Sequence, residues 1–154
     1  MAYVYLTPFD KNSQIFFTKI AQKVQIIKYN RGMNKICIVE DDESIRELYR
    51  YKLTSAGYNV CLAKDGKEAL IVLKKEKPDL ILLDIKMPKL PGNEVLKQIR
   101  ATDWGANIKV IVLTNISKSE APADFRFLGV SQYIVKAHYT PAQVLKIIQQ
   151  TLNN

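Results

Sequence analysis

The chain has 154 residues, of which 47% are hydrophobic, and a formal net charge of +8. A chain of this length and composition can form one compact domain with a substantial core, which excludes a disordered or fibrous protein. Half of the charge lies in residues 1–32, which hold five basic residues and one acid, and the other half is spread over residues 33–154, so no concentrated nucleic-acid-binding stripe is present.

Residues 1–32 do not share the rhythm of the rest of the chain and are predicted to be a basic N-terminal extension outside the fold. Apolar residues recur there at helical spacing, at Phe16, Ile20, Val24 and Ile27. Two interpretations of this extension therefore stay open, a helix between Ser13 and Tyr29 or a disordered segment. The domain is predicted to begin at Met33, with "MNKICIV", and to run over 33–154.

Beyond this extension, short apolar segments alternate with segments of helical periodicity. Strands are predicted at 35–40, 58–63, 79–84, 109–114 and 131–136. Helices are predicted at 44–57, 65–76, 93–101, 117–128 and 140–152, the fourth with the weakest pattern. Asp65 is a candidate cap of the second helix, and Thr140 followed by Pro141 marks the start of the last. Strands apolar on both faces predict an α/β fold with a parallel sheet between helices.

Polar residues stand where these strands end. Glu40 and Asp41 close the first strand, Asp84 the third, Thr114 the fourth and Lys136 the fifth. Open α/β sheets bind ligands at the carboxyl ends of their strands, where the strand order reverses. If the first and third strands are neighbours, at least three carboxylates crowd one pocket.

Such a cluster of like charges opposes folding unless a cation joins it, and an all-oxygen site suits Mg²⁺. Asp84 is the candidate nucleophile, because carboxylates can form acyl-phosphates. Lys136 and the metal would neutralise the transferred phosphoryl group, and Thr114 would hydrogen-bond one of its oxygens. In the loop after Asp84, Pro88 and Pro91 restrict the backbone, and Gly92 can adopt conformations closed to other residues. The alternative for "EDDES" alone is a solvated acidic loop.

Residues 33–154 resemble the receiver domain of two-component response regulators. The resemblance rests on an ordered set of motifs: "ICIVEDD", "LILLDIKMPKLPG", "VIVLT" and "YIVKA". The spacing agrees as well, with 43 residues from Asp41 to Asp84, 30 more to Thr114 and 22 more to Lys136. The resemblance implies a flavodoxin-like (βα)5 doubly wound sandwich with a five-stranded parallel sheet of order 2-1-3-4-5.

The resemblance also implies a mechanism. A sensor histidine kinase or phosphotransfer protein donates a phosphoryl group to Asp84, with Mg²⁺ held by Asp41, Asp84 and the Lys86 main-chain carbonyl, and by Glu40 through water. Thr114 and Tyr133 are then the switch residues. The remodelled face, formed by the fourth helix, fifth strand and fifth helix, binds a downstream protein. A homodimer is open, and direct DNA binding is not expected because no residues for an output domain follow Leu152.

Two positions depart from the family pattern. Ala137 follows the lysine where proline with a cis bond is usual, which leaves that geometry open. Asn115 replaces the usual small residue after the threonine. Lys86 and Ile116 occupy positions that tune phosphoryl lifetime, and neither is suited to position a hydrolytic water, so we expect a long-lived phosphoryl state.

Three rival functions remain. A phosphohydrolase of the haloacid dehalogenase type needs a second aspartate two positions after the nucleophile, where this chain has Lys86. A nucleotide or flavin module needs a glycine-rich loop, which does not follow the first strand. A receiver-shaped interaction module that is never phosphorylated is disfavoured by the complete set of site residues.

The cysteines and the distribution of apolar residues predict the cellular compartment of the protein. Cys37 and Cys61 lie in apolar strand-like runs and are predicted to be buried thiols in a reducing compartment, not a disulfide framework or a zinc site. No apolar stretch approaches membrane-spanning length, and Lys19 and Lys23 interrupt any signal-peptide core. We predict a cytoplasmic protein with no membrane association. His138 is predicted to be a surface residue.

Overall fold

The structure is a computed structural model that describes residues 15, 19 and 34–153. The chain divides into two units, residues 1–33 and 34–154, and the second holds all the elements described below. Of the predicted helix between Ser13 and Tyr29, Ile15 and Lys19 are described, and both are helical and exposed. The rest of that prediction lies outside the described residues.

The second unit is built on a five-stranded parallel sheet. Its strands are β1 (Lys35–Val39), β2 (Asn59–Ala63), β3 (Leu80–Leu83), β4 (Lys109–Thr114) and β5 (Gln132–Val135). Their order is β2-β1-β3-β4-β5, which confirms the predicted order. β1 lies between β2 and β3, pairing Val39 with Ala63 on one side and with Leu83 on the other. The end of β1 therefore meets the end of β3.

Four α-helices connect or follow the strands. They are α2 (Glu43–Ser55), α3 (Gly66–Glu76), α4 (Gly92–Arg100) and α5 (Pro141–Asn153). Their starts follow local chemistry, since the Asp42 and Asp65 side chains accept hydrogen bonds from backbone N–H groups in the first turns of α2 and α3. Thr140 and Gln143 form a reciprocal cap at the start of α5. The predicted caps at Asp65 and Thr140 are confirmed.

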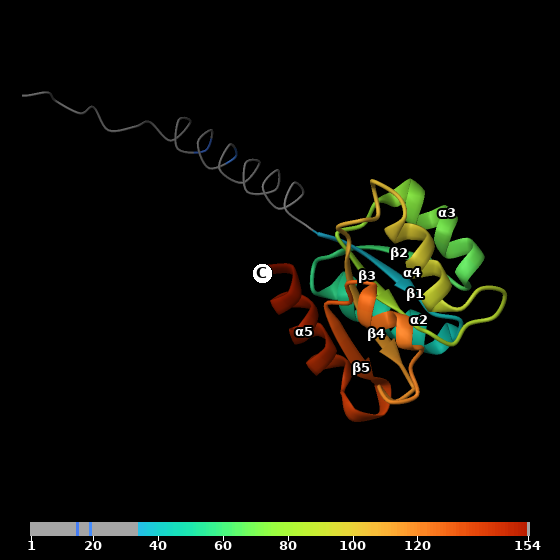
Figure 1. The fold of residues 1–154 in the computed structure, drawn as a ribbon. Helices are drawn as coiled ribbons and strands as arrows, with labels where there is room; N and C mark the ends of the chain where they lie inside the picture. Colours follow the sequence, from blue (N-terminus) through green and yellow to red (C-terminus); the bar gives the residue numbers. More distant parts are fainter. Residues whose placement is uncertain (1–14, 16–18, 20–33, 154) are drawn as a thin grey trace, which may run out of the picture. The chain divides into compact units, whose positions relative to one another are not determined.

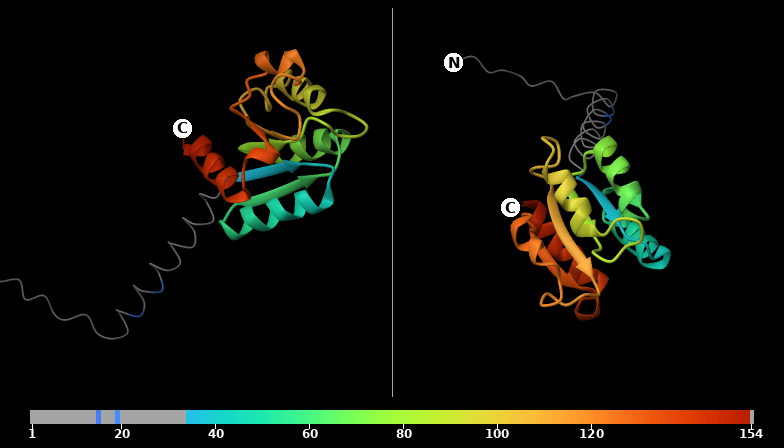
Figure 2. Two further views of the ribbon diagram at one scale, coloured as in Figure 1. Left: turned by 90° about the horizontal axis from the view of Figure 1, so that it is seen from below. Right: turned by 45° about the vertical axis from the view of Figure 1, so that its right-hand side comes forward.

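The core lies in two layers, one on each face of the sheet. One apolar cluster joins the sheet to α3 and α4, and the other joins it to α2 and α5. Figure 1 and the left view of Figure 2 show the two helical layers with the strands between them. β3 is fully buried along its length, and all but the first residue of β1 and β4 are buried as well. This sandwich fixes where the strand ends, and the polar residues after them, lie.

The predicted helix 117–128 is wrong. Only a short 3₁₀-helix, η1 (Ala123–Phe127), forms there, after a turn. Pro122 explains the difference, because proline in a helix interior removes a backbone donor and clashes with the preceding turn. Ser117 also bonds locally to Glu120 through both its backbone N–H and its hydroxyl, and such bonds compete with a helix.

Two local features complete the description of the fold. Leu48 of α2 is 47% exposed and lies beside the stripe that buries Tyr49 and Leu53. The peptide bond between Lys136 and Ala137 is trans, and these residues belong to a second 3₁₀ turn, η2 (Lys136–His138). Among the described residues, no helix combines the length and apolarity that crossing a membrane requires.

Candidate functional site

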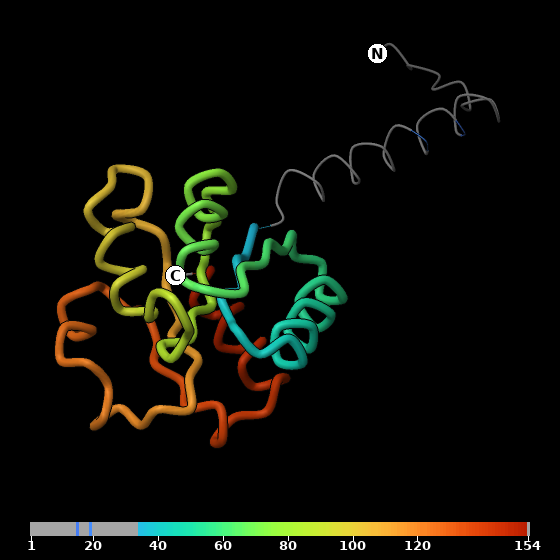
Figure 3. The backbone as a smooth tube through the Cα atoms, turned by 90° about the vertical axis from the view of Figure 1, so that its right-hand side faces the viewer, coloured from blue at the N-terminus to red at the C-terminus, as the bar shows by residue number. Residues whose placement is uncertain are grey.

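Polar side chains gather at the carboxyl ends of β1 and β3. The backbone of both strands continues one residue beyond the sheet, because Glu40 donates its N–H to Ala63 at 3.1 Å and Asp84 donates its N–H to Val39 at 2.9 Å. Figure 3 shows the chain from the side on which these strands end, with the connecting loops towards the viewer. The sheet register thus brings Glu40, Asp41 and Asp84 to one place.

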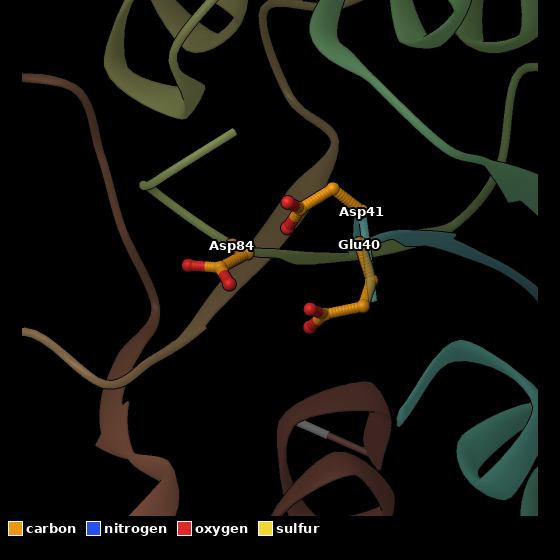
Figure 4. A group of neighbouring side chains, drawn as sticks. All are labelled: Glu40, Asp41 and Asp84. Atoms are coloured by element: carbon orange, nitrogen blue, oxygen red, sulfur yellow. The ribbon is translucent and has the colours of Figure 1, made fainter. Parts of the chain in front are cut away.

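These three acids form a compact oxygen cluster. One carboxylate oxygen of each lies within 4.8 Å of the other two, and Figure 4 shows the three side chains projecting into the same space. Glu40 and Asp84 are 3% and 6% exposed, whereas Asp41 is exposed. Two buried carboxylates at this distance are unfavourable unless positive charge joins them.

Lys136 supplies one such charge. Its Nζ lies 2.7 Å from Oδ2 of Asp84 and 2.6 Å from Oε2 of Glu40. Burial disfavours the charged form of Lys136, but its hydrogen bonds to Asp84 and Glu40 outweigh burial and raise the pKa of the lysine above its usual value. Burial raises the pKa of Glu40 to about 7, against the opposing effect of Lys136.

The cluster suits a divalent cation in its charge and its ligand atoms. Three ionised carboxylates and one ammonium carry a formal charge of −2, and the candidate ligand atoms are all oxygens. Mg²⁺ prefers this donor set and needs only one or two protein carboxylates besides water and phosphate oxygens. The residues therefore fit a hard divalent cation, with Asp41 reaching the solvent side of the cluster.

The two predicted switch residues lie on the neighbouring strands. Thr114 ends β4 and is fully buried, and its hydroxyl accepts a hydrogen bond from the Ile116 N–H at 3.4 Å. Tyr133 is half-buried, and its hydroxyl donates to the main-chain carbonyls of Ile116 and Ser117, at 2.9 and 3.4 Å. Both side chains therefore contact the start of the segment that joins β4 to η1.

The backbone beside Asp84 is tightly held. The Lys86 N–H donates to Oδ1 of Asp84 at 3.1 Å, and the Lys86 side chain is exposed. Gly92 donates its N–H to the Ile85 carbonyl at 2.8 Å. A Cβ at Gly92 would lie 2.2 Å from the Asp84 carbonyl oxygen, so only glycine permits this approach. The loop 85–91 is thus closed back onto the residue that it follows.

Several supporting residues were not anticipated from the sequence. Arg46 donates from one guanidinium nitrogen to the carbonyl oxygens of Glu40 and Asp41, at 2.8 and 3.2 Å. Lys89, which has a left-handed backbone with φ of 65°, forms an ion pair with the buried Asp65. A charged residue one turn into a helix, or a lysine between two prolines, carries no signal that would identify its partner.

Three further predictions from the sequence concern Glu40, His138 and the two cysteines. The role of Glu40 as a metal ligand through water stays a prediction, and in the structure its carboxylate pairs with Lys136. His138 is exposed, as predicted. Cys37 is buried and Cys61 is partly exposed, and both are free thiols.

Comparison with known proteins places this geometry in a family. The model of the response regulator receiver domain matches residues 36–149. The chain is similar to response regulator MprA of Mycolicibacterium vanbaalenii, with 39% identity over 105 residues that cover 66% of this chain and 43% of that protein. The chain spans less than half the length of the curated relatives it matches.

Solved structures agree. The chemotaxis response regulator CheY4 of Vibrio cholerae superposes with a TM-score of 0.71 and 32% identity, covering 77% of this chain and 98% of that one. The receiver domain of sensor histidine kinase PA1611 from Pseudomonas aeruginosa, which has a magnesium ion coordinated in its active site cleft, gives a TM-score of 0.70 at 27% identity and covers 80% of this chain and 100% of that one. The chain belongs to the response regulator receiver domain family of two-component systems.

Proposed function

We propose that the protein is a phospho-accepting response regulator in which Asp84 receives a phosphoryl group from the phosphohistidine of a sensor histidine kinase or phosphotransfer protein. The observation that carries the proposal is the pairing of the buried Asp84 with Lys136 at 2.7 Å, inside an oxygen cluster completed by Glu40 and Asp41. Carboxylate, ammonium and cation site are the parts that phosphoryl transfer requires.

The two carboxylate oxygens of Asp84, the proposed nucleophile, have different hydrogen-bond partners. Oδ1 accepts the Lys86 N–H and Oδ2 accepts Lys136, so the carboxylate is held on two sides. A carboxylate oxygen attacks phosphorus, the phosphorus–nitrogen bond to the donor histidine breaks, and the imidazole leaves with the electron pair. Lys136 then neutralises charge on the transferred group, since its Nζ already lies within hydrogen-bond distance of the attacking carboxylate.

Mg²⁺, when bound, would supply the further positive charge that neutralises the negative phosphoryl oxygens. Asp41 and Asp84 would hold it directly, with the Lys86 main-chain carbonyl as a further ligand and Glu40 acting through water. Arg46 supports this arrangement by binding the carbonyls of Glu40 and Asp41, which orients the backbone that carries both acids.

Phosphorylation would change the conformation of the segment that follows β4. A phosphoryl group on Asp84 adds charge and acceptor oxygens beside Thr114, whose hydroxyl is bonded only to the Ile116 N–H among the described residues. If the Thr114 hydroxyl turns towards the phosphoryl group, the Ile116 N–H loses its hydrogen bond to Thr114. The Ile116 carbonyl accepts the Tyr133 hydroxyl in this structure, so a change at Ile116 would also reach Tyr133. We propose that η1, β5 and α5 form the face that a downstream protein, or a second copy, binds.

We further propose a long-lived phosphoryl state and a cytoplasmic location. Lys86 and Ile116, at the positions that tune phosphoryl lifetime, supply no carboxylate or amide to orient an attacking water. The Lys86 side chain is exposed and Ile116 packs against the apolar cluster under α3 and α4, so neither is placed as a general base.

Intact mass after exposure to acetyl phosphate tests the proposal. With Mg²⁺ we expect one labile phosphoryl group on the wild type and none on Asp84→Asn, and we expect EDTA to abolish the gain. Asp103→Asn is the matched control, because Asp103 is an exposed acid outside the cluster. Phosphorylation of Asp84→Asn, or none on a folded wild type with Mg²⁺, would overturn the proposal.

A further inference from the structure

The two cysteines stand side by side in the sheet. Cys37 of β1 and Cys61 of β2 are direct partners in the register of the two parallel strands. Both belong to the apolar cluster under α3 and α4, so both side chains lie on the same face of the sheet. The Cys61 sulfur also lies 3.8 Å from the carbonyl oxygen of Ile36, the residue before Cys37.

We propose that Cys37 and Cys61 form a reversible, hydroperoxide-driven disulfide that joins β1 to β2. Neighbouring strands lie about 4.8 Å apart, which is within the roughly 4.4–6.8 Å Cα separation of bonded cysteines. No other cysteine exists in the chain, so an internal disulfide can only be this one.

The two thiols have different accessibility, which sets their roles. Cys37 is fully buried, whereas Cys61 is partly exposed on β2, the edge strand of the sheet. A hydrogen bond from the Cys37 thiol lowers the pKa of Cys61, and the same hydrogen bond together with burial raises the pKa of Cys37. Cys61 is therefore the thiol that meets an oxidant first, and Cys37 is the resolving thiol.

The chemistry consumes one hydroperoxide. The Cys61 thiolate attacks hydrogen peroxide, the oxygen–oxygen bond breaks, and a sulfenic acid forms while the leaving hydroxide takes the proton released by the Cys61 thiol and becomes the first water. The Cys37 sulfur then attacks the Cys61 sulfur, the sulfur–oxygen bond breaks, and the leaving hydroxide takes the Cys37 proton as a second water. Two thiols are oxidised and hydrogen peroxide is reduced to two waters.

The sheet makes this disulfide reducible. Cβ atoms of bonded cysteines lie roughly 3.5–4.5 Å apart, which is closer than the strand spacing, so the crosslink must draw the edge strand inwards. A strained disulfide near the surface is readily reduced by cellular thiols, which suits a switch in a reducing compartment. Glu40 follows β1 directly, three residues after Cys37, so the crosslink would lie on the strand that ends at the acidic site.

Thiol counting on the full-length protein tests the proposal. Native protein is treated with a small excess of hydrogen peroxide and then unfolded in urea that contains N-ethylmaleimide, which alkylates any remaining free thiol. The intact mass is then measured. We expect loss of two hydrogen atoms, no maleimide adduct, a peptide linking Cys37 to Cys61, and return of both thiols with dithiothreitol. We expect the crosslink to form at least about tenfold faster in native protein than in urea, because the fold pre-aligns the pair.

Cys37→Ser and Cys61→Ser are the controls, and neither should lose the two hydrogen atoms. The wild-type result decides even if a variant fails to fold. Two maleimide adducts after peroxide treatment, or added oxygen on Cys61 without a crosslink, would overturn the proposal. A crosslink that forms no faster in native protein than in urea would overturn it as well.

Discussion

Two segments that follow buried strands border the acidic site, and they are held in opposite ways. The loop after β3, residues 85–91, is fixed by close backbone approaches and by the Lys89–Asp65 ion pair. The segment after β4, residues 115–131, forms no α-helix and is attached mainly through side chains. Under the proposed function, the first segment holds the carboxylate that accepts the phosphoryl group, and the second is the segment that changes when this carboxylate is modified.

The largest expected effect comes from Gly92, the first residue of α4, which closes the loop 85–91 back onto Asp84. Gly92→Ala places a Cβ 2.2 Å from the Asp84 carbonyl oxygen, and backbone atoms cannot move aside easily. We expect a loss of about 1–3 kcal/mol in the free energy of unfolding. Gly129→Ala is the comparison in the second segment, because its Cβ would lie no closer than 3.8 Å to any atom, an ordinary contact, and only the positive φ of 62° opposes it, at roughly 1 kcal/mol. Urea unfolding measures both free energies, and equal losses for the two variants would contradict the difference between the two segments.

The second effect concerns the pH dependence of stability. A hydrogen bond from Lys89 lowers the pKa of Asp65, so this carboxylate stabilises the fold above its unfolded pKa, and the contribution is lost as pH falls through the lower folded value. Lys89→Met should therefore make unfolding free energy less dependent on pH in the acid range. Lys67→Met, at an exposed lysine in the first turn of α3, is the control. Parallel pH profiles for wild type and Lys89→Met would show that the pair does not hold the loop.

A third, smaller effect lies in the second segment. Tyr133→Phe removes the hydrogen bond to the Ile116 carbonyl, which is 2.9 Å long, and should lower the free energy of unfolding by about 0.5–1.5 kcal/mol. Tyr139→Phe is the matched control, since Tyr139 is 40% exposed. An unchanged stability for Tyr133→Phe would mean that this contact does not attach the segment.

The smallest effect is expected at the ion pair between α4 and η1. Lys97 lies 2.6 Å from Asp124 and 2.8 Å from Glu94, but it is 43% exposed, so Lys97→Met should cost less than about 1 kcal/mol. The exposed Lys118, changed to Met, is the control. Thermal unfolding at low and high salt measures the difference, which salt should reduce. A loss as large as that of Gly92→Ala would contradict the weak attachment of this segment.

The same contrast governs what could be predicted from the sequence. Strand positions and the order of polar strand ends could be predicted, because apolar runs and capping residues such as Asp65 are local signals. The helix over 117–128 could not be placed correctly, because its apolar pattern competes with Pro122 and the local bonds of Ser117. Partners such as Arg46 and Lys89 depend on three-dimensional proximity, which no spacing in the chain reveals.

The proposed function depends on Asp84 being the residue that accepts the phosphoryl group. Sodium borohydride reduces an aspartyl phosphate to homoserine, so treatment of the phosphorylated protein followed by peptide mass spectrometry identifies the residue directly. We expect homoserine at position 84 only, dependent on Mg²⁺ and absent from Asp84→Asn. Homoserine at position 41 or 42, or none in protein that has gained a phosphoryl group, would contradict it.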